Sequence, residues 1–531
     1  MVKLVALLRE PKRSVRIVAG VLASLAFLVT GFSWALASPP GAFPDDGFHL
    51  LNTWCPPPLN TSGCETRNVK GTTYAKVPRV IGVSGCGGTT TQEKNCLSER
   101  YDLQKTWTNG TSTNKLNTDR YPWGYYQFHN HLISNSFNTS VVTMRFANVG
   151  IAVGCLAILF ILAPTRLRPT LTLVFLVSWV PMGIYFISSN NPSSWSILGV
   201  ALYSTALYAA TQSAGKRRYA LIVLAGLGAI LCYTSRADAA FYVFVASLVI
   251  WILELPSKKQ LDLLIFSGVA SVVGVLLALD SKHASDALEY TAATPNRFEQ
   301  LIGLVQSSPN FFFGFWGVSP WSPGWFNANL RPDGPAFVLV SLGILLSLGL
   351  KSSSKRKLVA VVISLGAILG IPIVIMMSQG YMSLSLGYQP RYLLPLLVVL
   401  LFSILVPVRR GADYVMSLRI KVAAIVFLAL SNGISLMSVL RKYTYTKEEF
   451  SPLWSGEDLK GGVLFIRGNE IDWWWNIPLG LKKVLILGFL AFLIGALLLT
   501  WLSHVSARHS EISPNETAEI QGVEEENSDR I

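Results

Sequence analysis

The stretch Ser38-Pro39-Pro40-Gly41-Ala42-Phe43-Pro44-Asp45-Asp46-Gly47-Phe48-His49-Leu50 directly follows the first apolar segment of the chain. Its prolines lack an amide hydrogen and fix φ, so we expect the chain to leave a membrane helix here in a stiff, extended form. Asp45 and Asp46 would then lie at the membrane surface. Neighbouring carboxylates that are partly desolvated raise one of the two pKa values, and such a group can accept a proton from a hydroxyl. An ordinary polar turn is the alternative.

The composition is that of a membrane protein. Of the 531 residues, 51% are hydrophobic and 14% are charged, and the mean hydropathy is +0.44. We therefore predict an all-α polytopic membrane protein, since a helix needs about 20 apolar residues to cross the hydrocarbon. Twelve spans are expected, at 17–37, 146–164, 171–188, 195–213, 219–235, 240–255, 261–279, 335–350, 358–378, 393–408, 422–440 and 484–503.

The distribution of Lys and Arg predicts the orientation of these spans. Residues 1–16 and alternate short connections are rich in basic residues, which favours the cytoplasm for them and for both termini. The net charge of +14 follows largely from these inner segments, so it argues for contact with anionic lipid and not for nucleic-acid binding. Outside the membrane we expect the loops 38–145, 280–334 and 441–483, and inside it a disordered acidic tail at 504–531.

Four of the six cysteines fall in the first outer loop, namely Cys55, Cys64, Cys86 and Cys96. On the oxidising side of a membrane this pattern predicts two disulfides in a small loop subdomain, and the pairs 55/64 and 86/96 are the simplest of three connectivities. A zinc site is the rival interpretation, but two tight C-x-x-C pairs are not present, so no metal site is predicted.

Polar residues recur at the other outer turns. Residues 188–194 form an uncharged polar turn that contains Asn190 and Asn191, and Arg236 and Asp238 form a candidate ion pair in a short hairpin. That pair either sits at the membrane interface as a salt bridge or faces a cavity shared with the two aspartates.

Two further outer segments carry arginine. Arg391 follows Pro390 at the expected start of a helix, and a guanidinium at a helix N-terminus suits a phosphate. A snorkelling arginine would give the same pattern. The loop 280–334 contains Arg297 and then an aromatic stretch broken by Gly and Pro at 311–325, which is typical of an interfacial element.

Several catalytic classes lack their motif in this sequence. No P-loop, G-x-G-x-x-G, H-E-x-x-H or G-x-S-x-G stands in a fitting context, which argues against nucleotide-driven transport and soluble-type hydrolase chemistry. The six histidines are scattered, and His49 is the one close to the aspartate pair in sequence.

Five motifs in this order resemble a bacterial membrane-protein family, the one catalogued as domain of unknown function 2142. They are Pro39-Pro40 with residues 44–49, the turn 188–194, Arg236-Ala237-Asp238, residues 314–320, and Arg391-Tyr392-Leu393-Leu394-Pro395. The resemblance covers residues 15–440, and the family itself looks like a branch of the C-type glycosyltransferases (GT-C). The residue after the first acid is commonly Glu in that family, so Asp46 departs conservatively, and the cysteine-containing loop lies outside the pattern.

The resemblance implies an integral membrane glycosyltransferase in the bacterial cytoplasmic membrane, with a GT-C-like core at 17–440. The expected donor is a polyprenyl-phosphate-linked sugar, and the acceptor is a cell-envelope glycan or glycolipid on the outer face. Asp45 or Asp46 would be the catalytic base, with Asp45 favoured. The candidates for binding substrate or phosphate are Arg391, Arg236, Asp238, His49, Asn190, Asn191 and Arg297. No cofactor is required by this scheme, and a divalent cation is left open.

Two other classes of protein fit the same sequence. A transporter or flippase of lipid-linked sugars would keep ionisable groups at mid-membrane depth and often shows internal repeats. The expected spans contain almost no ionisable residues and no clear repeat. A non-catalytic envelope assembly protein would need the first outer loop but not the two aspartates.

Overall fold

The structure is a computed structural model of the chain. It describes residues 11–59, 63–70, 72–78, 81, 105–109, 116, 121–254, 260–281, 296–326, 328–349, 354–407, 418–444, 475 and 477–512.

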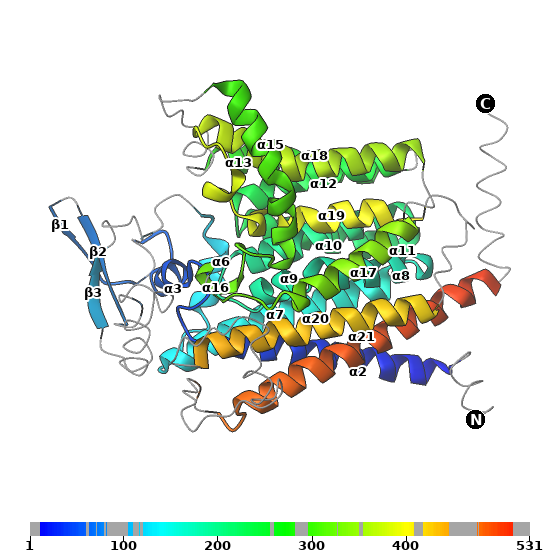
Figure 1. Ribbon diagram of the computed structural model, residues 1–531, viewed down its shortest axis with the longest axis horizontal. Coiled ribbons are helices and arrows are strands. Elements are labelled where there is room, and N and C mark those ends of the chain that lie inside the picture. Colours follow the sequence, from blue (N-terminus) through cyan, green and yellow to red (C-terminus); the bar gives the residue numbers. More distant parts are fainter. Residues whose placement is uncertain are drawn as a thin grey trace, which may run out of the picture.

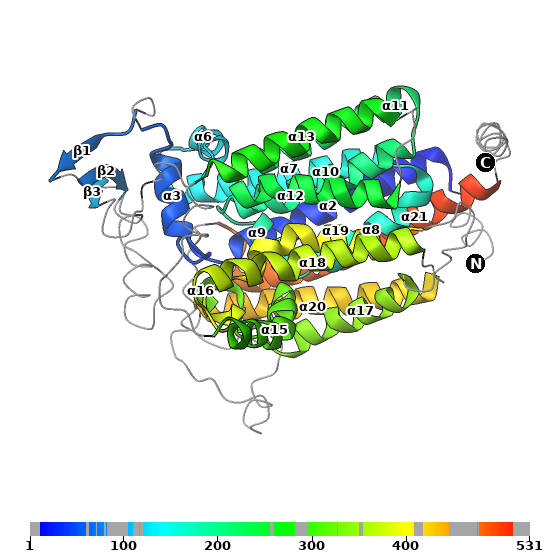
Figure 2. The ribbon, with the colours of Figure 1, turned by 90° about the horizontal axis from the view of Figure 1, so that it is seen from above.

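Long helices that run side by side make up most of the described chain (Figure 1). The first residue of the first helix and the last residue of the last one lie at the same end of this bundle, and the small sheet lies beyond the opposite end (Figures 1 and 2). The bundle consists of α2 (Arg13–Leu36), α7 (Phe137–Leu162), α8 (Arg168–Trp179), α9 (Met182–Ile187), α10 (Ser193–Thr211), α11 (Gly215–Tyr233), α12 (Ala237–Leu253), α13 (Leu261–Leu279), α17 (Asp333–Gly349), α18 (Lys355–Ser378), α19 (Leu394–Leu405), α20 (Leu418–Thr444) and α21 (Leu481–Ile512).

Six of the described helices are long and apolar enough to cross a membrane, namely α2, α7, α13, α18, α20 and α21. The predicted number of twelve spans is therefore wrong, although each predicted range overlaps a helix. The remaining helices are short, carry charge or, like the 19-residue α10, contain several Ser, Thr and Tyr residues. The expected span 171–188 consists of two short helices that meet at Val180 and Pro181, and α11 opens on Gly215-Lys216-Arg217-Arg218. The helices α12, α17 and α19 are apolar but shorter.

Two helix boundaries lie furthest from the prediction, the start of α7 and the end of α21. Helix α7 begins at Phe137, where the Ser136 side chain accepts the Thr139 N–H, so it starts nine residues before the expected 146 and includes Arg145. Helix α21 continues to Ile512, the last residue that the structure describes, past the expected end at 503. The first part of the predicted acidic tail is thus helical, and residues 513–531 lie outside the described part.

Glycines allow close packing inside the bundle. A Cβ on Gly199 of α10 would lie 2.7 Å from the carbonyl oxygen of Gly228 in α11, and a Cβ on Gly228 would lie 2.7 Å from the carbonyl oxygen of Gly199. The two backbones therefore touch, as small residues permit between membrane helices. Any larger residue at either position would push α10 and α11 apart.

A short antiparallel sheet belongs to the loop 38–145, so the protein is mostly helical and not all-α as predicted. Its strands are ordered β1 (Thr66–Val69), β2 (Thr72–Pro78) and β3 (Lys105–Asn109), with Arg67 opposite Tyr74 and Lys76 opposite Trp107. Threonine, valine and aromatic residues, which favour strands, are frequent in all three.

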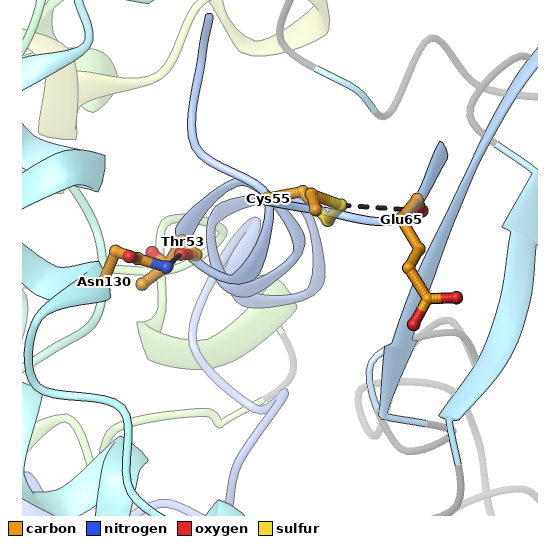
Figure 3. Close-up of a disulfide and its surroundings, with 5 residues drawn as sticks. Thr53, Cys55, Glu65 and Asn130 are labelled. Carbon is orange, nitrogen blue, oxygen red and sulfur yellow. Dashed lines mark hydrogen bonds between the residues drawn. A yellow bond between two sulfur atoms is a disulfide. The ribbon is translucent and has the colours of Figure 1, made fainter. Parts of the chain in front are cut away.

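The disulfide Cys55–Cys64 ties this sheet to α3 (Asp46–Trp54), the first helix after the two aspartates (Figure 3). This confirms one of the two predicted pairs. On the other side of α3, the Asn130 side chain of α6 (Gly124–Asn130) donates to the Thr53 carbonyl. Cys86 and Cys96 lie outside the described residues, and Cys155 and Cys232 are free and buried.

Short elements connect the long helices. Helices α3, α6 and α16 (Pro323–Phe326) lie at the end of the bundle that faces the sheet (Figure 1). The 3-10 turns are η1 (Thr165–Leu167), η3 (Gly314–Trp316), η4 (Leu384–Leu386) and η5 (Pro390–Leu393). Helix α15 (Arg297–Phe313) runs across the direction of the long helices (Figure 1). Apolar side chains on one of its faces are exposed, namely Phe298, Leu301, Ile302 and Val305. We expect this face to contact lipid.

Candidate functional site

The two aspartates lie at the start of α3, immediately after the proline-rich exit from α2. Asp45 adopts a left-handed conformation (φ 60°) and precedes the first helical residue, Asp46. The Gly41 N–H donates to Asp46 Oδ2 at 2.7 Å, and the His49 N–H donates to the Asp45 carbonyl at 2.9 Å. Because the backbone turns sharply between the two residues, their side chains meet different partners.

Asp46 is fully buried against Arg145 of α7. The Arg145 Nη2 lies 3.3 Å from Asp46 Oδ2, and neither side chain is exposed. The same guanidinium donates to the carbonyls of Ala35, Ser38 and Pro39, at 2.9, 2.7 and 3.3 Å. Burial raises the pKa of Asp46, against the attraction of Arg145. This pair therefore holds the exit from α2 in place.

Asp45, in contrast, is partly exposed and pairs with Arg391. The Arg391 Nη2 lies 2.5 Å from Asp45 Oδ2, and the Asp45 side chain is 35% exposed against 5% for Arg391. Burial alone would raise the pKa of Asp45, but the charge of Arg391, with those of His49 and Arg236, lowers it below its ordinary value. Asp45 is thus an ionised, accessible carboxylate at neutral pH.

A second ion pair adjoins the first through an aromatic ring. Arg236 donates through Nε and Nη2 to the two carboxylate oxygens of Asp238, at 2.9 and 2.8 Å. This confirms the predicted ion pair. The guanidinium carbons of Arg236 and Arg391 lie 4.8 and 5.0 Å from the centre of the Tyr392 ring. The two arginines therefore share one aromatic neighbour. The structure shows the salt bridge, and neither Arg236 nor Asp238 lines the cleft beside Asp45.

His49 and Asn191 support the backbone around Asp45. The His49 Nδ1 and the Tyr126 hydroxyl are 2.9 Å apart, and both residues are buried. The Asn191 Nδ2 donates to the Pro44 carbonyl at 3.0 Å. Its neighbour Asn190 is also buried, and neither polar atom of that side chain has a hydrogen-bond partner among the described residues.

The structure does not bring Arg297 into this cluster. Arg297 is the first residue of α15, and its Nη1 donates to the Met377 carbonyl near the end of α18. The opposite end of α15 is the one that leads to the cluster, since Gly314 lies against Pro390. Arg297 thus joins α15 to α18 at the end of α15 that lies away from Asp45.

The described part of the chain contains no group of three or more His, Cys, Asp or Glu side chains that could hold a metal ion. One oxygen of each aspartate is already paired with an arginine. The described residues around the two aspartates thus offer two carboxylates that are each bound to an arginine, and no step of the chemistry below uses a metal ion.

Sequence reasoning missed three residues of this region. Arg145 was placed in the outer loop, because the span was expected to begin one residue later. An arginine inside an apolar helix, between Met144 and Phe146, was the available signal. Tyr392 adjoins Arg391 in sequence, and Trp321 stands in the aromatic stretch at 311–325, but nothing in the pattern singled either of them out.

Six candidate membrane spans, with a cluster of charged residues at one end of the bundle, define a multi-pass helical membrane protein. The chain belongs to the family described as predicted membrane proteins, DUF2142, whose family model matches residues 27–400. No curated protein and no solved structure matches the chain.

Proposed function

We propose that this protein is a GT-C-type glycosyltransferase. It transfers a sugar from a polyprenyl-phosphate-linked donor to a cell-envelope glycan or glycolipid on the outer face of the bacterial cytoplasmic membrane. The observation that carries the proposal is the contact between Asp45 and Arg391, in which an accessible carboxylate lies beside a nearly buried guanidinium. A base for the acceptor and a cation for a leaving phosphate are the two groups that such a transfer needs.

The proposed reaction is a single displacement. The oxygen of an acceptor hydroxyl attacks the anomeric carbon of the donor sugar, and its proton passes to Asp45. The bond from the anomeric carbon to the phosphate oxygen breaks, and that oxygen keeps the electron pair. Arg391 stabilises the negative charge that develops there. The lowered pKa of Asp45 keeps the group ionised at neutral pH, the form a base must have, and it makes Asp45 a weaker base than a carboxylate with a raised pKa.

Asp46 has a positioning role in this scheme. Its side chain is inaccessible, and it binds Arg145 and the Gly41 N–H instead of facing a substrate. Together with Arg145 it fixes the backbone that presents Asp45. The structure therefore supports Asp45, the acid favoured by the resemblance, as the base.

The remaining members of the cluster arrange the charges. Asp238 engages Arg236 through two nitrogens, Nε and Nη2. Arg391 meets Asp45 through Nη2 alone and keeps Nε and Nη1 without a hydrogen-bond partner among the described residues, so we assign the leaving phosphate to Arg391. Asn191 and His49 fix the backbone on either side of Asp45. Asn191 binds the Pro44 carbonyl, and the His49 N–H binds the Asp45 carbonyl in the first turn of α3.

Analysis of a deletion strain tests the proposal. Loss of the gene should leave a lipid-linked sugar unused and one glycan linkage missing, and a plasmid copy should restore the linkage. A copy with Asp45→Asn should insert in the membrane but not restore it. An assembly protein would be indifferent to this substitution, and loss of a flippase would accumulate the donor on the inner face only. Either result would refute the proposal.

A further inference from the structure

A cleft opens beside the Asp45–Arg391 pair. It is lined by Arg391 and Gln389, by Trp321 and Ser322, and by apolar side chains that include Phe186 and Phe326. Pro44, the residue before Asp45, also contributes to the wall. The cleft therefore adjoins the pair on which the proposed function depends.

Three residues that line the cleft carry buried polar atoms with no hydrogen-bond partner among the described residues. Among the described residues, the Trp321 Nε1, the Arg391 Nε and Nη1, and the Gln389 Oε1 are buried and have no hydrogen-bond partner. Trp321 is 5% exposed and Arg391 is 6% exposed. Three of these atoms are donors, while Gln389 Oε1 is an acceptor. Leaving buried donors unpaired is costly, so the three donors on Trp321 and Arg391 indicate a ligand that accepts hydrogen bonds.

The position of Trp321 is fixed by its neighbours. A Cβ on Gly314 would lie 2.4 Å from Trp321 Cδ1 and 2.6 Å from Pro390 Cγ. The indole therefore packs on a glycine next to Pro390, the residue before Arg391. By contrast, the Trp316 Nε1 is satisfied by the Val177 carbonyl at 3.0 Å, as is usual for a buried indole.

We propose that Trp321 is a ligand-binding residue, and that its indole N–H and the two unpaired guanidinium nitrogens of Arg391 bind the same anionic group. All of these groups are donors, so the ligand must present acceptor oxygens with negative charge, which a phosphate does. The neighbouring side chains Met182, Phe186, Phe326 and Leu394 are apolar, and they suit a hydrocarbon chain on that phosphate. The ligand class is thus a phosphate ester of an apolar alcohol.

The size of the cleft adds a requirement. Its enclosed part measures about 10 Å³, which is room for about one water molecule. A phosphate must therefore enter through the mouth and displace the side chains there. Phe326 is 38% exposed and lines the cleft, so it is the side chain that moves in this proposal.

Binding of farnesyl monophosphate to the purified full-length protein tests the inference. Trp321→Phe keeps an aromatic ring but removes the N–H, and it should weaken binding by about tenfold, as expected for a lost hydrogen bond to a charged group. Trp179→Phe is the matched control, since the Trp179 Nε1 is also buried and unpaired but does not line the cleft. It should leave the affinity unchanged.

A second variant guards against misfolding of the first. Gln389→Glu adds a negative charge to the wall and should also weaken binding of farnesyl monophosphate, without affecting binding of farnesol. Competition by inorganic phosphate would show that the headgroup alone occupies the cleft. Competition by lipid phosphates only would show that the chain is required as well. In either case, Trp321→Phe should weaken binding of the competitor as much as it weakens binding of farnesyl monophosphate, which places the phosphate at Arg391.

The chemical class of the donor, but not the existence of the subsite, rests on the proposed function. Binding that is sensitive to Trp321→Phe in a protein without transferase activity would refute the proposed function and leave the subsite standing. Farnesyl monophosphate binding that is equal in wild type, Trp321→Phe and Gln389→Glu would overturn the inference, as would the absence of binding to the wild-type protein.

Discussion

Arg391 Nη2 and Asp45 Oδ2 lie 2.5 Å apart, although 346 residues separate them in the chain. Asp45 comes from the loop after the first helix, and Arg391 from the short helical turn before α19. The fold thus joins the first and the last of the motifs at 39–395 in one ion pair. This pair affects the protonation of Asp45. It also gives Asp45 a different partner from that of the neighbouring Asp46.

The protonation of Asp45 should depend on Arg391. The arginine lowers the pKa of Asp45, and burial alone would raise it, so Arg391→Gln should move the pKa upward. Asp45 would then become protonated at a higher pH. Modification by a water-soluble carbodiimide, which reacts with protonated carboxyl groups, can be followed by mass spectrometry across the pH range.

In the wild type, labelling of Asp45 should begin only at a pH below the ordinary pKa of an aspartate. In Arg391→Gln it should begin at a higher pH than in the wild type. Arg297→Gln is the control, because Arg297 contacts the Met377 carbonyl and not Asp45. An unchanged labelling profile in Arg391→Gln would show that the ion pair does not form.

Arg145 should matter for stability more than any partly exposed arginine. Arg145→Met leaves Asp46 buried without its partner and removes the donor to three carbonyls, which should cost about 3–5 kcal/mol. Arg331→Gln breaks a partly exposed pair with Asp333 and should cost less than about 1 kcal/mol. Thermal unfolding of the purified variants in detergent gives the comparison. Equal stability of the two variants would contradict the positioning role of Asp46 and Arg145.

The orientation in the membrane remains a prediction from the basic residues. A periplasm-active reporter fused after residue 90 should be active, since the loop 38–145 is expected outside, and one fused near residue 215 should be silent. The start of α2 and the end of α21 lie at the same end of the bundle, so a fusion after Ile512 should be silent too (Figure 1). The reverse pattern would place Asp45 in the cytoplasm.

The second disulfide is tested by thiol labelling. Cys55 and Cys64 are paired in the structure, and we expect Cys86 and Cys96 to pair as well. Labelling of the denatured, unreduced protein should then reach only Cys155 and Cys232, which are free. Four labelled cysteines would leave the first disulfide in place and exclude the second.

The sequence predicted the membrane class and one ion pair because these depend on local features. Apolar length indicates a helix, and Arg236 and Asp238 are two residues apart. It overestimated the number of spans, because an apolar run alone does not distinguish a helix that spans the membrane from a shorter one packed inside the bundle, such as α12. The separate roles of Asp45 and Asp46 were not predictable, since they depend on Arg145 and Arg391 from distant helices.

The family match covers residues 27–400 and includes both aspartates and Arg391. Tyr443 of α20, outside that range, donates to the Ala42 carbonyl at 3.1 Å, and the Trp475 indole donates to the Leu36 carbonyl at 2.9 Å. The C-terminal part of the chain therefore helps to hold the loop that carries Asp45, a contribution that the spacing of residues could not reveal.

The central claim is that Asp45 is the base of a sugar transfer and that Asp46 holds its loop. The most direct measurement is the turnover of purified wild type, Asp45→Asn and Asp46→Asn with the lipid-linked sugar that accumulates in the deletion strain. Asp45→Asn should lower turnover by about 10²- to 10⁴-fold with donor binding retained. Asp46→Asn should lower the unfolding temperature more than it lowers the turnover of the folded protein. Near-normal turnover in Asp45→Asn would contradict the claim.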